Sequence, residues 1–185
     1  MSVLDVLGAL RRAVTDETSF AVVGAVARNA WAPPRATTDL DLAAAASPDV
    51  LLALSAALLP LGYARVREQR AEPNDPMPDI IIFRSDHAVP RQVDLLVAKT
   101  AFEVQALHRA VAVDVAGAEV RVVTPEDLVV YKLIASRPRD RDDVRAVART
   151  QARMGRPLDW SHVEKWAAYW GITDRAAELR RDLGE

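Results

Sequence analysis

The chain has 185 residues, 50% of them hydrophobic, which is enough for one domain with a sizeable core or for one domain with a helical appendage. Its formal net charge of −2 gives no reason to expect a protein that binds polyanions through bulk positive charge. Cysteine is absent, which excludes disulfides, zinc sites built on thiolates and cysteine nucleophiles.

The first residues predict an amphipathic helix, because apolar side chains recur at helical spacing from Val3 to Val14. This segment lacks the basic start and continuous apolar run of a signal peptide. The most apolar segment, residues 50–59, is too short to span a bilayer. We therefore expect a cytoplasmic protein with no membrane association.

Strands and helices are predicted to alternate over the first two thirds of the chain. Strands are expected at residues 19–24, 39–43, 62–66, 79–84, 91–97, 111–115 and 119–123, with a loop at 71–78 and turns at 85–90 and at Gly117. Helices are expected from the N-terminus to about residues 15–18, and at residues 25–31, 48–59 and 101–108.

The last third is predicted to be helical. Thr124 reads as an N-cap with Pro125 at the first helical position and Asp127 at the third. Further helices are expected at residues 139–154 and 160–185, the latter with a break at Gly171. The order predicts an α/β (α+β) fold with a mixed β-sheet flanked by helices. We expect an α/β core over residues 1–124 and a C-terminal helical region over residues 125–185 that packs on the core.

Two aspartates interrupt the apolar run in the segment TTDLDLAAA. Asp39 and Asp41 are two residues apart, so on a strand both side chains point to one face, while Leu40 and Leu42 point to the other. Two carboxylates this close raise each other's pKa unless a cation lies between them. Carboxylate oxygens suit Mg²⁺, which usually takes one or two protein carboxylates and substrate phosphates. The alternative is a strand end whose aspartates simply face solvent.

Three further features favour the metal site. Asp94 lies within the apolar strand sequence RQVDLLV, where an unpartnered charge is costly. Gly24 and Ala25 lie where a strand runs into a helix, and free backbone N–H groups at a helix N-terminus bind phosphate. Arg35 lies between that helix and the aspartates, where it could pair with phosphate oxygens. A carboxylate cluster that faces a phosphate site is typical of enzymes that catalyse phosphoryl or nucleotidyl transfer.

These segments resemble a known superfamily. Gly24, RATTDLDL (residues 35–42) and VDLL (residues 93–96) resemble the nucleotidyltransferase superfamily, the polymerase-β-like minimal fold. The run PEDLVVYKLIASRPRDRDDV (residues 125–144) resembles the AbiEii-type branch, the toxin component of certain bacterial toxin–antitoxin and phage-defence systems. The resemblance covers residues 20–147 and implies a nucleotidyltransferase-like mixed sheet flanked by helices.

The resemblance also implies a mechanism. Asp39 and Asp41 would hold Mg²⁺, with Mn²⁺ as an alternative, on the triphosphate of an NTP. Asp94 would complete a second metal site and help deprotonate an acceptor hydroxyl, and Lys132 would complete the catalytic set. The residues that would contact the nucleotide are Gly24, Ala25, Arg35, Thr37 and Lys132. The family motif usually reads Gly-Ser or Gly-Gly, whereas Ala25 offers phosphate a backbone N–H without a hydroxyl.

Charged residues in the helical third have two interpretations each. Lys132, within an apolar helix, either reaches the triphosphate or extends its charge to the surface. Asp140 and Asp143 share one helix face. We favour a structural role for both, in which they stabilise a helix N-terminus or orient Lys132 or Arg139.

A stripe of arginines follows on the same helix. Its members recur every four residues: Arg141, Arg145, Arg149 and Arg153. We interpret the stripe as a solvated face rather than an RNA-binding surface, because no aromatic residues accompany it. The tryptophans of the tail, Trp160, Trp166 and Trp170, are expected to pack against the domain or against a partner.

We therefore predict an Mg²⁺-dependent nucleotidyltransferase that moves an NMP from an NTP to an acceptor hydroxyl of tRNA, a protein or a small molecule. The resemblance makes the toxin of a toxin–antitoxin system a candidate identity, with an antitoxin protein as partner. The alternative is a catalytically weak or inactive nucleotide- or RNA-binding protein of the same fold, which Ala25 favours and the three aspartates oppose. A third interpretation is an interaction protein held by an antitoxin through its tail.

Overall fold

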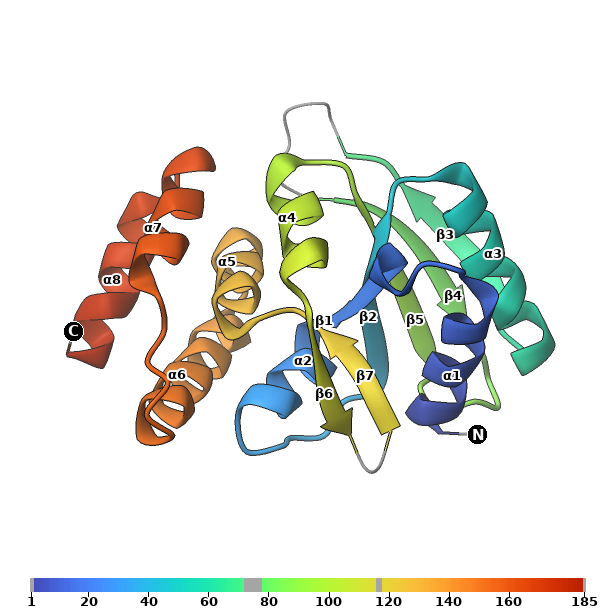
Figure 1. The fold of residues 1–185 in the computed structure, drawn as a ribbon, viewed down its shortest axis with the longest axis horizontal. Coiled ribbons are helices and arrows are strands. Elements are labelled where there is room, and N and C mark those ends of the chain that lie inside the picture. Colours follow the sequence, from blue (N-terminus) through green and yellow to red (C-terminus); the bar gives the residue numbers. More distant parts are fainter. Residues whose placement is uncertain (1, 72–77, 116–117, 185) are drawn as a thin grey trace.

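The computed structural model describes residues 2–71, 78–115 and 118–184, and in these ranges the chain forms a seven-stranded sheet and eight α-helices (Figure 1). The strands are β1 (Phe20–Val23), β2 (Asp39–Ala45), β3 (Ala64–Gln69), β4 (Asp79–Arg84), β5 (Gln92–Ala98), β6 (Val111–Val115) and β7 (Ala118–Val122). The helices are α1 (Val3–Ala13), α2 (Gly24–Trp31), α3 (Pro48–Leu58), α4 (Ala101–Arg109), α5 (Pro125–Ala135), α6 (Pro138–Arg153), α7 (Trp160–Tyr169) and α8 (Thr173–Leu183).

The sheet is mixed, with the strand order β3-β4-β5-β2-β1-β7-β6. β2 pairs with β5 and β1 pairs with β7 in parallel, and the other neighbours are antiparallel. The predicted fold class is thereby confirmed. Most of the predicted loop at residues 71–78 and the turn at Gly117 lie outside the described residues.

Alternation along the strands divides the sheet into a core face and an open face. Leu40 and Leu42 of β2, and Val93 and Leu95 of β5, have no exposed surface. Helices α1 and α3 pack against each other, and α3 also contacts β2 (Figure 1). The period of two therefore sends the intervening aspartates to the other face, as the sequence predicts.

The first helix ends earlier than predicted, at Ala13. Val14 is extended, and the Asp16 carboxylate accepts a hydrogen bond of 2.8 Å from the Thr18 backbone N–H. This local bond starts a short 3₁₀ turn, and such side-chain caps compete with continuation of a helix.

Helices α5 to α8 follow the last strand and pack on one another (Figure 1). Thr124 caps α5 as predicted, since its hydroxyl accepts a hydrogen bond from the Asp127 backbone N–H. The buried Asp127 carboxylate also lies 2.6 Å from Nε2 of His162, which ties α7 to the start of α5. The division at residue 124 stays a prediction. Within the described ranges, no helix combines the length and the apolar character that crossing a membrane requires.

Candidate active site

The predicted carboxylates lie on neighbouring strands. β2 and β5 run parallel, with Asp41 opposite Asp94 and Asp39 opposite Gln92. Neighbouring strands are about 4.8 Å apart, so the three aspartates share one region of the open face. The strand of Asp94 therefore lies beside the strand of Asp39 and Asp41, which is the condition for the three carboxylates to converge.

The position of the Asp41 side chain leaves no room for a side chain at Gly24. A Cβ atom on Gly24 would lie 1.9 Å from Oδ2 of Asp41, and the residue has a φ of +63°. Only glycine satisfies both conditions without strain. The Ala25 backbone N–H also hydrogen-bonds to the Asp41 carboxylate, which lowers the pKa of that carboxyl against the effect of burial. The predicted free N–H at this helix start is thus engaged by Asp41, and a phosphate would have to share or replace that contact.

Electrostatics favour a cation among the three carboxylates. Burial, together with the charges of Asp94 and Asp39, raises the pKa of Asp41 to about 6. Burial and the Asp39 charge also raise the pKa of Asp94, although hydrogen bonds of 2.9 and 3.0 Å from Gln92 oppose the shift. Asp41 and Asp94 therefore resist ionisation beside their acidic neighbours, and a divalent cation would remove that repulsion.

The donor set fits Mg²⁺ or Mn²⁺, because it consists of hard carboxylate oxygens and contains no sulfur or imidazole. The side chains are not gathered into a preformed site: in the described ranges, no group of three or more Asp, Glu, His or Cys side chains is arranged to hold a metal ion. The side chain of Asp39 instead accepts a hydrogen bond of 3.0 Å from the Thr38 hydroxyl.

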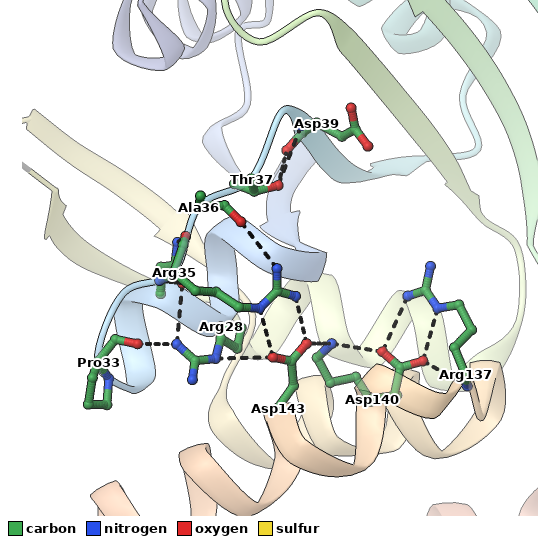
Figure 2. Close-up of polar contacts among 11 residues, drawn as sticks. Arg28, Pro33, Arg35, Ala36, Thr37, Asp39, Arg137, Asp140 and Asp143 are labelled. Carbon is green, nitrogen blue, oxygen red and sulfur yellow. Dashed lines mark hydrogen bonds and ion pairs between the residues drawn. The ribbon is translucent and has the colours of Figure 1, made fainter.

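Positive side chains gather around two further carboxylates, those of Asp140 and Asp143 (Figure 2). We call this group the cation cluster; it comprises Arg28, Arg35, Lys132 and Arg137 around Asp140 and Asp143. Four cations surround two carboxylates, so the cluster has surplus positive charge. Such a surplus favours an anion close by.

Asp143 is the centre of the cation cluster. Its carboxylate accepts bonds of 2.9 and 2.8 Å from Nε and Nη2 of Arg35 and 2.7 Å from Nζ of Lys132, and it lies 3.3 Å from Nε of Arg28 (Figure 2). Burial opposes ionisation of Asp143, but the hydrogen bonds from Arg35 and Lys132 outweigh it and lower its pKa to about 2. Asp143 is thus a permanent anion that holds three cations in place.

Lys132 is buried, with 5% of its surface exposed, so the interpretation as a surface lysine is wrong. Its ammonium bonds to Asp140 at 3.0 Å as well as to Asp143. The orienting role predicted for the two aspartates is therefore present in the geometry. Arg137 Nε completes the set at 2.9 Å from Asp140.

Sequence reasoning missed three residues of this region. Arg28 and Arg137 belong to the cation cluster, and Asn29 bonds to the backbone of Arg35 through both ends of its amide, at 2.8 and 3.0 Å. Arg28 lies four residues after Gly24 on α2, a spacing that would have placed it one turn along the same face. Thr37, a predicted nucleotide contact, bonds to the backbone of Asp39 at the start of β2.

Two cavities meet at the aspartates. The first, of about 380 Å³, we call the polar compartment; it is lined by Ala25, Arg35, Thr37, Asp39, Gln92, Arg139 and Asp140. The second, of about 300 Å³, we call the apolar compartment; it lies between the open sheet face and α5 and is lined by Val23, Gly24, Pro78, Ile80, Leu96, Leu128, Tyr131, Ile134 and Ala135. Four residues line both: Asp41, Asp94, Lys132 and Arg137.

The arginine stripe is largely exposed, as predicted, although its first two members also form ion pairs. Arg141 lies 3.0 Å from Glu178, and Arg145 pairs with Asp182, so the first half of the stripe binds α6 to α8. Arg149 and Arg153 are exposed. The tail tryptophan Trp166 packs against the domain as predicted, with its ring centroid 5.3 Å from that of Phe102.

Comparison with known proteins gives a family match and a fold match. The family model described as nucleotidyl transferase of unknown function (DUF2204) matches residues 82–180, just over half of the chain. The solution structure of the antibiotic-resistance factor ANT(2'')-Ia is 15% identical, with 97% of this chain and 96% of that chain covered and a TM-score of 0.60. The crystal structure of ANT(2'')-Ia in complex with adenylyl-2''-tobramycin is 14% identical, with 97% of each chain covered and a TM-score of 0.57. These two matches show a shared fold.

A more distant structural match is MenT4, a nucleotidyltransferase toxin of Mycobacterium tuberculosis H37Rv. It is 16% identical, with 95% of this chain and 81% of that chain covered and a TM-score of 0.41. Among curated proteins, no sequence matches the chain.

Proposed function

Because the chain belongs to the nucleotidyl transferase family of unknown function (DUF2204), we propose that it transfers a nucleoside monophosphate from an NTP to an acceptor hydroxyl with the help of Mg²⁺ or Mn²⁺. The observation that carries this proposal is the pairing of Asp41 with Asp94 at the junction of a carboxylate-lined cavity and the cation cluster. A binding protein for an anion alone would have no need of carboxylates at this place.

Asp39, Asp41 and Asp94 would hold the metal. When bound, the metal would polarise the phosphate oxygens and stabilise charge that develops on the entering and leaving oxygens. Asp94 would also help to remove the proton of the acceptor hydroxyl. The raised pKa of Asp41 supports this assignment, since the repulsion that raises it is what a bound cation would relieve.

Arg35, Lys132 and the Ala25 backbone N–H would contact the triphosphate. The first two already pair with Asp143, so their charges are positioned before the nucleotide arrives. Arg139 lines the same cavity and is exposed, and no other described residue pairs with it. It is therefore the cation best able to meet the outermost phosphate.

The acceptor could belong to tRNA, a protein or a small molecule. One of the structural matches is ANT(2'')-Ia in complex with adenylyl-2''-tobramycin, which makes a small-molecule acceptor reasonable for this fold. A toxin role and an antitoxin partner rest on the resemblance of residues 125–144 to the AbiEii-type branch. A cytoplasmic location rests on the N-terminal segment, which lacks the pattern of a signal peptide.

The test incubates the protein with each α-labelled NTP, Mg²⁺ and, in separate reactions, total tRNA, total protein or a small-molecule mixture. The variant Asp41→Ala removes a proposed metal ligand, and Asp86→Ala, at an exposed site in the β4–β5 connection, is the matched control. Transfer by the wild type and by Asp86→Ala, but not by Asp41→Ala, is expected. Absence of transfer from every NTP, together with NTP binding that Asp41→Ala leaves unchanged, would contradict the proposal.

The alternative is a nucleotide-binding protein of the same fold with weak or no catalysis. Ala25 favours it, because the residue lacks the hydroxyl that would contact phosphate. The same reactions separate the two functions: tight, metal-dependent NTP binding without label transfer to any acceptor would favour the alternative.

A further inference from the structure

We propose that the apolar compartment receives the acceptor, and that the acceptor is a small neutral molecule with a hydroxyl group on an apolar or aromatic body. The proposal rests on the nucleotidyl transfer proposed above and names its acceptor class. Four observations carry it: the two compartments have different linings, they meet at the aspartates, the apolar one is small, and the cations on its wall are already engaged.

The linings assign the triphosphate to the polar compartment. Arg35, Thr37 and Arg139 line the polar compartment and not the apolar one. The described residues that belong only to the apolar compartment carry no charge. A triphosphate is strongly anionic and needs charged or N–H donors, so its β- and γ-phosphates belong on the side of Arg35 and Arg139.

The direction of the reaction assigns the acceptor to the other side. In phosphoryl transfer the attacking and leaving oxygens lie roughly in line across the phosphorus atom. Asp41 and Asp94 line both compartments, which places the α-phosphorus at their junction. If pyrophosphate leaves toward the polar compartment, the acceptor oxygen must approach from the apolar compartment.

The step balances without a further reactant. The acceptor hydroxyl oxygen forms a bond to the α-phosphorus, and the bond from that phosphorus to the α–β bridging oxygen breaks. The bridging oxygen keeps the electron pair and leaves as part of pyrophosphate. The hydroxyl proton passes to the Asp94 carboxylate and from there to water.

The size and charge of the apolar compartment define the acceptor class. Its volume of about 300 Å³ is at the lower end of small-molecule sites. Ile80 and Leu96 form the sheet wall, and Leu128, Ile134 and Ala135 of α5 form the opposite wall. An apolar or aromatic body between these walls would lose contact with water, which favours its binding.

Ionic acceptors lack partners in the apolar compartment. Of its two cations, Lys132 is already assigned to the triphosphate, and Arg137 pairs with Asp140. A nucleic acid would need several free Lys or Arg side chains for its phosphates. A polycation would compete with the metal for Asp41 and Asp94, the two described carboxylates that line this compartment.

The experiment fills the apolar compartment from each wall. Ile80→Trp adds bulk from β4, and Ala135→Trp adds it from α5, so one variant suffices if the other fails to fold. The matched control is Leu52→Trp on α3, where the wild-type side chain is 70% exposed. Saturation-transfer NMR measures binding of 2-phenylethanol, a neutral aromatic alcohol, and a fluorescence titration measures binding of each NTP with Mg²⁺. Label transfer is compared for 2-phenylethanol, tobramycin and total tRNA.

We expect 2-phenylethanol to bind the wild type and Leu52→Trp, and to bind the filled variants about tenfold or more weakly. NTP affinity should stay within about twofold in all variants, because the polar compartment is unchanged. Label should move to 2-phenylethanol in the wild type and not in the filled variants.

Three results would overturn the proposal. Equal binding of 2-phenylethanol by wild-type and filled proteins would show that the alcohol does not occupy the compartment. Weaker NTP binding in the filled variants would assign the compartment to the nucleoside. Transfer to tRNA or tobramycin that survives filling would assign the acceptor to another class. Failure of the proposed function is distinguishable, because the wild type would then transfer label from no NTP.

Discussion

Replacing Asp41 by asparagine should stabilise the metal-free protein at neutral and alkaline pH, although it should abolish transfer. The unfolded chain releases the Asp41 proton near the ordinary pKa of 3.8, whereas the folded protein releases it near 6. Between these values the folded state binds more protons, so stability falls as pH rises and the full penalty is present above pH 6. Asparagine keeps an acceptor for the Ala25 N–H and carries no charge.

The size of the expected stabilisation follows from the shift in the pKa of Asp41. A shift from 3.8 to about 6 corresponds to an upper bound of about 3 kcal/mol. Asp41 retains some contact with solvent, which screens its neighbours, so we expect a gain of about 1–2 kcal/mol in the free energy of unfolding at pH 8. The gain should shrink toward zero at pH 4, where the carboxyl is protonated in the folded state.

Urea denaturation in the presence of EDTA measures the free energy of unfolding of the wild type and Asp41→Asn at pH 8 and pH 4. Asp86→Asn is the control for an exposed aspartate. Added Mg²⁺ should then stabilise the wild type and leave Asp41→Asn unchanged, because the variant lacks the ligand. An asparagine variant no more stable than the wild type at pH 8, or a difference that is the same at both pH values, would refute the electrostatic reasoning.

Three other substitutions test the neighbouring contacts. Asp143→Asn should lower the free energy of unfolding by about 3–5 kcal/mol in urea denaturation, because it removes one of the two counter-charges of the buried Lys132 ammonium. A loss below ~1 kcal/mol would be inconsistent with a buried ion pair. Gly24→Ala should lower the free energy of unfolding by about 2 kcal/mol or more and abolish transfer. The new Cβ would displace the Asp41 carboxylate, and residue 24 has a φ of +63°, which alanine adopts only with strain. A variant with wild-type stability would contradict the packing described for this glycine. Ala25→Ser should lower the KM for NTP severalfold in steady-state kinetics by adding a phosphate donor, and an unchanged KM would show that the position does not contact phosphate.

Local patterns predicted most of the secondary structure. The alternation Asp39-Leu40-Asp41-Leu42 assigns each side chain to a face without any knowledge of the partner strand, because a strand has a period of two. Thr124 and Pro125 define a helix start for the same local reason. The resemblance to the nucleotidyltransferase superfamily is confirmed by the family match, whereas the toxin-like branch and the role of each site residue stay predictions.

The predictions that were wrong or incomplete concern contacts between distant residues. Arg35 was predicted as a phosphate contact, which stays a prediction, but its pairing with Asp143, 108 residues further along the chain, was not foreseen. Lys132 had a surface interpretation that its burial excludes, and the ion pairs of Arg141 and Arg145 with the last helix were not predicted. No local pattern reports burial or an ion-pair partner, because both depend on how helices pack after the sheet has formed.

The sequence by itself determined which residue types this protein offers: three carboxylates on strand faces, a glycine at a helix start and a lysine among apolar residues. Their spacing follows from backbone periodicity, which is a local property. The tertiary structure decided what those residues meet. The parallel pairing of β2 with β5 set Asp41 opposite Asp94, and the packing of α6 on α5 and α2 placed Asp143 among its cations. Strand register and helix packing are set by burial of the whole core, so the sequence of one segment cannot reveal them.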